Sequence, residues 1–247
     1  DKIKVYKANM IIPQIAENLT KSGNIQIPQE CPVCSGETEI RSIKEGRALY
    51  CTNPNCHARL VLSITHYVSR NAMNIEGLSE ETISKFIEQG FIENYTDIYR
   101  IEKFKDDIIK MEGFGEKSYS NIISSIEKSK NVALPNFIYA LGINQVGLSN
   151  AKLLCSFTDY DIEKIKNISE EELIDVEGFG SVIAHSIFSY FHNPQNIKLL
   201  DNALTYITFE AYEKKEPGSL QGITFVITGD VEKFKNMDLS IDNTVDG

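Results

Sequence analysis

The sequence predicts a mainly α protein of tandem helix-hairpin-helix repeats, together with a small four-cysteine module and short flanking β segments. Three observations support this fold class. The tetrapeptide Glu-Gly-Phe-Gly occurs twice, at residues 112–115 and 177–180. The apolar residues on both sides of the two copies match at a constant offset of 65 positions, so a whole unit of structure is repeated. Four cysteines also stand in two close pairs in the first quarter of the chain.

The first element is a short β segment in residues 1–17. Polar and apolar residues alternate from Lys2 to Lys7, which is typical of a half-buried strand. One strand cannot be a domain, so we expect the chain to begin inside a larger protein. Residues 18–30 are polar and are interpreted as a linker.

The second element, residues 29–60, contains the motifs Cys-Pro-Val-Cys and Cys-Thr-Asn-Pro-Asn-Cys, with residues 41–50 between them as polar hairpin strands. Four thiolates suit tetrahedral zinc, and each close pair aims two sulfurs at one ion. The alternative of two disulfides is disfavoured because nothing in the sequence suggests a secretory signal. Four cysteines close the coordination shell, so we expect a structural zinc ribbon or finger. The expected ligands are Cys31, Cys34, Cys51 and Cys56.

The third element, residues 61–212, carries the repeats. After each Gly-Phe-Gly, apolar residues recur at i, i+3, i+4 and i+7, which is one face of a helix. The second glycine opens that helix, whose first N–H groups have no partner within the helix and attract anions. Offsets of 33 and 101 reveal two further, degenerate copies. Each unit predicts a hairpin that holds a phosphate with main-chain amides. The four units are centred near Gly77, Gly113, Gly147 and Gly178.

The four hairpins are not equivalent. The first has Ser79 in place of its second glycine, and the third has Gln145 in place of its first. We expect these two to bind phosphate less well or to serve packing, so that the two Gly-Phe-Gly hairpins carry more of the phosphate grip. The alternative that the glycines are only tight turns stays open for the first and third units. The candidate binding residues are Gly77, Gly113, Gly115, Lys117, Gly147, Gly178, Gly180 and Ser181.

The rest of the sequence limits the classes of function. Residues 213–219 form a charged linker rich in Pro, Gly and Ser, and residues 220–247 hold one β-rich run that is too short for a finished domain. No run of about 18 apolar residues exists, so we expect no membrane partner. The formal net charge of −10 argues against a generic basic nucleic-acid binder. It does not exclude hairpins that bind through uncharged main-chain amides.

The motifs occur in an order that resembles one family. The two cysteine motifs, then the run from His66 to Gly77, then four helix-hairpin-helix units resemble the C-terminal half of bacterial NAD-dependent DNA ligase. Residues 4–13 resemble the last strand of that ligase's OB-fold domain, and residues 220–229 resemble the opening of its BRCT domain. The resemblance implies the end of an OB-fold at 1–17, a zinc finger at 29–60, a DNA-binding domain at 61–212 and an incomplete BRCT-type segment at 220–247.

The resemblance also implies an activity for the whole enzyme. A lysine in a Lys-x-Asp-Gly motif accepts AMP from NAD and passes it to the 5′-phosphate at a nick, which the 3′-hydroxyl then seals. This chain has no such motif, since its only Asp-Gly is Asp246-Gly247, preceded two positions earlier by Thr244. We therefore expect no catalytic residue here, an inactive fragment on its own, and NAD and Mg²⁺ bound elsewhere. The implied partners are nicked double-stranded DNA and the catalytic N-terminal domains of the same polypeptide.

The implied setting is replication and repair in the bacterial cytoplasm, at the nucleoid. Two other functions stay open from the residues alone. One is a stand-alone, non-catalytic helix-hairpin-helix adaptor in DNA repair. The other is a protein-interaction scaffold whose hairpins are only structural and whose acidic surface meets a basic partner.

Overall fold

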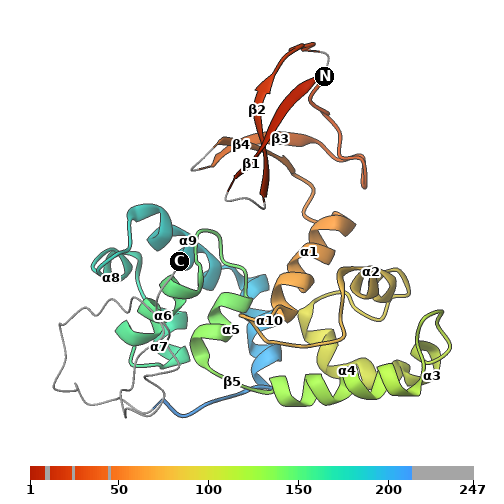
Figure 1. Ribbon diagram of the computed structural model, residues 1–247. Helices are drawn as coiled ribbons and strands as arrows, with labels where there is room; N and C mark the ends of the chain where they lie inside the picture. Colours follow the sequence, from red (N-terminus) through yellow and green to blue (C-terminus); the bar gives the residue numbers. More distant parts are fainter. Residues whose placement is uncertain (9–11, 24–25, 44–45, 213–247) are drawn as a thin grey trace, which may run out of the picture. The chain divides into compact units, whose positions relative to one another are not determined.

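The computed structural model describes residues 1–8, 12–23, 26–43 and 46–212 (Figure 1). Residues 1–210 form one compact unit. In the described residues the fold is mainly α, with ten α-helices, one 3₁₀-helix and three two-stranded sheets, as the sequence predicts. None of the described helices is both long and apolar enough to cross a membrane. The predicted linker at 213–219 and the BRCT-type segment at 220–247 lie outside the described residues.

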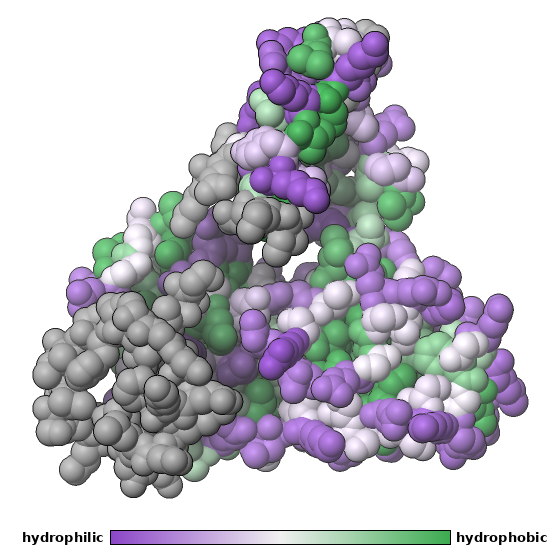
Figure 2. All heavy atoms as spheres, in the orientation of Figure 1, coloured by the Kyte–Doolittle hydropathy of each residue, from purple (hydrophilic) through white to green (hydrophobic). Residues whose placement is uncertain are grey.

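The N-terminal segment is an antiparallel hairpin of β1 (Ile3–Ala8) and β2 (Ile12–Asn18), in which Val5 pairs with Ile15. The sequence indicated β structure here but not the second strand. Asp1 ties the open end, since its carboxylate accepts hydrogen bonds from Asn18 and Thr20. Large apolar side chains of this hairpin are exposed to solvent, and Figure 2 shows hydrophobic residues on the strands at the top of the view.

The cysteine module contains the second hairpin, β3 (Thr38–Ile43) and β4 (Gly46–Cys51), at the position that the sequence predicts. Thr38 pairs with Cys51 across it. The module runs directly into α1 (His57–Val68), whose N-cap is Cys56. The cysteine module and the helical region therefore meet at Cys56, because the last cysteine of the module is also the N-cap of the helix.

The repeats are built from short helices joined by tight hairpins. The helices after α1 are α2 (Glu80–Glu88), η1 (Tyr95–Phe104), α3 (Lys105–Ile108), α4 (Glu116–Ser129), α5 (Leu134–Ala140), α6 (Leu148–Phe157), α7 (Ile162–Asn167), α8 (Glu170–Ile174), α9 (Ser181–Phe191) and α10 (Pro194–Leu204). Strands β5 (Asn131–Val132) and β6 (Thr208–Phe209) pair in parallel and tie the segment after α4 to the segment after α10.

The apolar stripes predicted from the repeat form the core. On α4 the buried members are Tyr119, Ile122 and Ile126, and on α9 they are Ala184, Ile187 and Phe191. Phe179 is buried beneath its hairpin, whereas Phe114 is half-buried and packs on Phe86, with ring centroids 5.5 Å apart. Cys155 is fully buried, and burial raises the pKa of its thiol to about 12, so it acts as a small apolar core residue.

Buried polar contacts join elements that are distant in sequence. The hydroxyl groups of Tyr67 on α1 and Tyr99 on η1 lie 2.8 Å apart, and Tyr67 also stacks on Tyr95. The amide of Asn202 on α10 donates to the buried hydroxyl of Thr96 over 2.9 Å. The segment η1 is thus fixed to both α1 and α10, which holds the first and last parts of the repeat region in one core.

Candidate nucleic-acid interface and metal centre

The turns of all four hairpins share one backbone feature. Each places a single residue at positive φ: Gly77 (87°), Gly113 (84°), Gln145 (64°) and Gly178 (92°). In the last three the next residue donates its N–H to the carbonyl three positions back, at 3.0 Å in every case. A turn whose third residue has positive φ favours glycine at that position. Gln145 therefore occupies the place of the first glycine, which confirms the register inferred from the offset of 33.

The helix that follows each hairpin also starts at the predicted position. The N-caps of α2, α4, α6 and α9 are Ser79, Gly115, Gly147 and Gly180. For the three glycine caps no side chain of the cap accepts from the first turn of the helix. At the first hairpin the Ser79 hydroxyl accepts from the N–H of Thr82 at 3.2 Å. At the second hairpin the Ser118 hydroxyl accepts from the N–H of Gly115 at 3.0 Å. The protein thus caps the first turn of one helix with a side chain and leaves the first-turn amides of three helices for a ligand.

The space above the glycines separates binding positions from packing positions. A Cβ atom built on Gly113, Gly115, Gly147 or Gly180 would meet no atom within 4 Å. A Cβ atom on Gly77 would lie 2.9 Å from Cγ1 of Ile122 on α4. Gly77 is therefore required where the first hairpin packs against the helix of the second unit. Gly178 is intermediate, because its Cβ would be 3.5 Å from Cδ1 of Leu153.

The two predicted side-chain contributors sit at exposed helix starts. Lys117 is the second residue of α4, and Ser181 is the first residue of α9. Val182, at the position in α9 that corresponds to Lys117, is 65 % exposed. The second and fourth hairpins thus share the same main-chain geometry, but the second residue of the following helix is charged in one and uncharged in the other.

A small cavity of about 360 Å³ lies between the first two hairpins, with Gly77 and Gly113 among its lining residues. The only lysine in its lining, Lys85, forms an ion pair of 2.9 Å with Glu81, and the hydrogen bond that Lys85 donates to this carboxylate raises the pKa of Lys85. Glu112 also lines the cavity. Because this cation is already balanced by acids, an anion at these hairpins would depend mainly on main-chain N–H groups.

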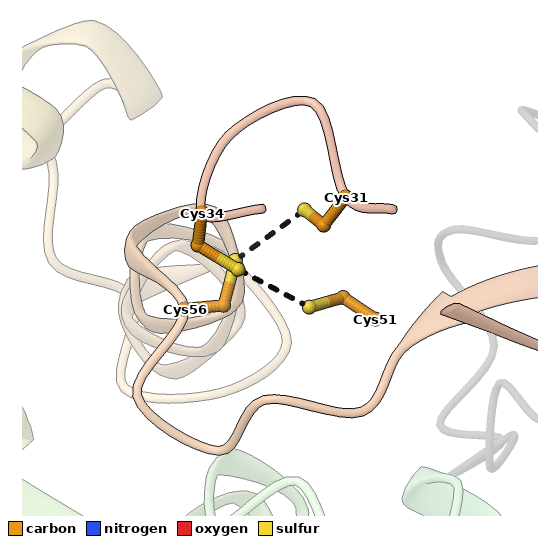
Figure 3. Close-up of side chains that lie close together, drawn as sticks. All are labelled: Cys31, Cys34, Cys51 and Cys56. Atoms are coloured by element: carbon orange, nitrogen blue, oxygen red, sulfur yellow. Dashed lines mark hydrogen bonds between the residues drawn. The ribbon is translucent and has the colours of Figure 1, made fainter. Parts of the chain in front are cut away.

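The four cysteines of the module converge, as Figure 3 shows. Their sulfur atoms all lie within 4.8 Å of one another, and they turn toward a common centre. The Sγ–Sγ distance is 3.5 Å between Cys34 and Cys51 and 3.9 Å between Cys31 and Cys56. A tetrahedral ion with metal–sulfur bonds of about 2.3 Å separates its sulfurs by about 3.8 Å. The cluster therefore has the dimensions of a closed four-thiolate metal site.

Local backbone contacts shape this cluster. The cysteines are free thiols, so the alternative of two disulfides is not found. The N–H of Cys31 donates to the carbonyl of Gly36 at 2.7 Å, which closes the turn that carries Cys34. A hydrogen bond from the Gly36 backbone, with one from Asn53, lowers the pKa of Cys34 to about 6. Burial raises the pKa of Cys51 to about 12.

Side-chain hydrogen bonds, in addition to the covalent chain, hold the cysteine module and the helices beside it together. The guanidinium of Arg59 donates to the carbonyl of Asn53 at 3.1 Å. His57, which directly follows the last cysteine, has its Nε2 atom 3.0 Å from the hydroxyl of Ser84 on α2. This imidazole is therefore engaged with α2, and the four sulfurs remain the candidate ligand set.

Comparisons with known proteins agree with this geometry. A family model described as a helix-hairpin-helix motif matches residues 136–200. The chain is 52 % identical over 238 residues to a DNA ligase of Lachnoclostridium phytofermentans and 46 % identical over 239 residues to a DNA ligase of Ruminiclostridium cellulolyticum. Each alignment covers 96 % of this chain and 36 % of the relative. A DNA ligase of Bacillus subtilis is 35 % identical over 245 residues, which is 94 % of this chain.

The chain thus spans about a third of the length of the curated relatives it matches. Over nearly its whole length it is homologous to a part of these DNA ligases, which confirms the resemblance drawn from its motifs.

Proposed function

We propose that this chain is the DNA-binding C-terminal region of an NAD-dependent DNA ligase, and that it clamps nicked duplex DNA while the rest of the enzyme seals the break. The observation that carries the proposal is the set of three glycine-capped helix starts with open space above them. The homology to DNA ligases supplies the enzyme in which such a clamp would work.

The hairpins would act through main-chain groups. The first N–H groups of α4, α6 and α9 point out of helices that are ten or more residues long, and the helix dipole favours negative charge there. A backbone phosphate oxygen at such a start accepts from amides that have no helical partner. Gly113, Gly115, Gly147, Gly178 and Gly180 are the residues whose lack of a side chain leaves this approach open, since only Gly178 would bring a Cβ even into ordinary contact. Because phosphate contacts carry no base information, the clamp should show weak sequence preference.

The four-cysteine cluster would hold a structural zinc ion. The sulfur spacing fits a tetrahedral site, and all four ligands are thiols. When bound, zinc would contribute folding free energy. Cys31 and Cys34 precede β3, Cys51 ends β4, and Cys56 caps α1, so the ligands would fix the hairpin to the start of α1. The zinc module would therefore order the joint that leads into the repeats.

The rest of the enzyme would supply the chemistry. NAD and Mg²⁺ would bind to the catalytic N-terminal domains of the same polypeptide, and this fragment alone would be inactive. The segment boundaries at 1–17, 29–60, 61–212 and 220–247 belong to the same proposal, with the cytoplasm and the nucleoid as the place of action in replication and repair.

The direct test is a fluorescence titration of the chain with nicked duplex DNA at two salt concentrations. We expect binding that weakens as salt rises, because counterions are released where the partly positive helix starts and cations beside them, such as Lys117, neutralise phosphates. Absence of salt-dependent binding by the wild-type chain would contradict the proposal and would favour a protein-interaction scaffold.

A further inference from the structure

A second cavity among the described residues is a polar groove that the hairpins do not account for. It has a volume of about 870 Å³ and lies between the segment from α1 to α2, the side of α4, and β5 with the start of α5. Its lining includes the buried residues Ala72, Met73 and Ser129, which belong to the core. The floor is therefore fixed by the fold.

The exposed side chains of the groove are mostly hydrogen-bonding groups. Asn74 lies on the segment before the first hairpin, Asn121 and Ser124 lie on α4, and Asn131 begins β5. A contact across one end holds the walls together, because the N–H of Glu76 donates to the hydroxyl of Ser125 on α4 at 2.7 Å. Amides and hydroxyls thus face a groove whose two walls are hydrogen-bonded to each other.

The lining contains two exposed cations, Arg70 and Lys128. Neither forms an ion pair with any carboxylate of the described residues, whereas Lys85, Lys130, Lys164 and Lys166 all do. The groove also contains the carboxylates of Glu76 and Glu210, so its formal charge is balanced. It therefore does not suit a compact anion in general, but it offers two separate cationic contacts to an extended ligand.

This set of groups matches one class of ligand. Arginine, lysine, serine and asparagine side chains are those that contact the phosphates and sugars of nucleic acids. The volume lies within the range of about 300–1,000 Å³ of sites for small molecules, which leaves room for a short stretch of a strand. Gly77 lines both this groove and the cavity between the first two hairpins, so one strand can run past both.

From these contacts we propose that the groove binds the sugar-phosphate backbone of one DNA strand, with Arg70 and Lys128 on separate phosphates. The inference rests on the proposed function and adds a side-chain site to the main-chain hairpins. It also gives the first unit a role that its serine-capped hairpin does not provide. The sequence suggested no role for either cation, because the groove forms only when α4 packs beside the segment after α1.

The test uses the salt dependence of binding to nicked duplex DNA. In the double variant Arg70→Gln/Lys128→Gln, the slope of log affinity against log salt should fall by about 2, roughly one for each lost phosphate contact. The matched control, Lys103→Gln/Lys198→Gln, removes the same formal charge at exposed positions outside the groove. Its slope should stay near that of the wild type. Equal slopes in the two double variants would overturn the groove as a binding site.

A second variant keeps the test valid if the first does not fold. Ser124→Asp adds a negative charge to the exposed side of α4 within the groove and should weaken binding by about tenfold, with Ser63→Asp on the exposed side of α1 as its control. Ser124→Asp binding as tightly as Ser63→Asp would contradict the proposal. A wild-type chain without salt-dependent binding would instead contradict the proposed function. Capture of a free mononucleotide by the groove, with an unchanged duplex slope in the double variant, would overturn the strand assignment.

Discussion

Two different constraints, backbone conformation and packing, act on single positions of the hairpins. Gln145 holds a φ of +64° without being glycine, so a side chain is tolerated at the first position of a hairpin when the turn is otherwise supported. Gly77 could not be replaced in this way, because its Cβ would approach Ile122 to 2.9 Å. The residue type at the first glycine position of the repeat is thus determined by packing at Gly77 and by backbone conformation alone at Gln145.

A matched pair of substitutions separates these constraints. Gly113→Ala places a side chain at φ +84° with no neighbour within 4 Å and should lower the free energy of unfolding by about 1–2 kcal/mol. Gly77→Ala adds the contact with Ile122 and should lower it by about 1–3 kcal/mol more. Chemical denaturation of both variants measures the difference. Equal stabilities would mean that α4 moves aside and that Gly77 has no packing role.

Among the elements, the helix starts were the most predictable from sequence. The offsets of the apolar frame placed the caps at Ser79, Gly115, Gly147 and Gly180, because a buried stripe with a helical period fixes where each helix lies. The strand Ile12–Asn18 and the 3₁₀-helix Tyr95–Phe104 were not predicted. The 3₁₀-helix depends on contacts across the chain, such as the Tyr67–Tyr99 hydroxyl pair, which no local pattern reveals, whereas the strand pairs with its neighbour β1.

The site divides in the same way. The clustering of the four cysteines and the positions of the hairpin glycines could be predicted from spacing, since two close cysteine pairs and a repeated Gly-Phe-Gly are local signals. The packing of Gly77 on Ile122 and the groove with Arg70 and Lys128 could not, because both arise where α4 meets residues some fifty positions earlier in the sequence.

The joint between the cysteine module and α1 makes a prediction at the element scale. Cys56 is both a candidate ligand and the N-cap of α1, so loss of the metal should loosen the first turn of that helix. We expect one equivalent of zinc in the purified chain. Chelation should speed hydrogen exchange in the first turn of α1 while α9 keeps its protection.

Cys155→Ala is the control for this experiment, because Cys155 is buried in the core and lies outside the metal cluster. That variant should retain its zinc, whereas Cys34→Ser should lose it. Zinc well below one equivalent in the unchelated wild-type chain would count against the four-thiolate site.

For the whole molecule, the formal charge of −10 is compatible with the proposed DNA binding when the main contacts carry no formal charge. Helix starts meet this condition, since their partial positive charge comes from aligned peptide dipoles. The two groove cations add a limited electrostatic component. A largely acidic chain can in this way bind a polyanion at a few defined points and repel it elsewhere.

The central claim is that main-chain amides at the helix starts hold the phosphates. The triple variant Gly115→Asp/Gly147→Asp/Gly180→Asp tests it most directly, because these caps have φ values of −167°, −78° and −99° that any residue adopts and open space for a Cβ. Aspartate is a favourable N-cap, so the fold should stay intact while three carboxylates take the place of phosphates. The matching triple asparagine variant caps the same amides without charge.

The deciding measurement is the dissociation constant for nicked duplex DNA at fixed salt. We expect the aspartate variant to bind at least about tenfold more weakly than the wild type, a loss of about 1.4 kcal/mol or more, with the asparagine variant in between. Unfolding free energy and zinc content should match the wild type. An aspartate variant that is folded, zinc-loaded and as tight a binder as the wild type would contradict the claim that these helix starts hold DNA.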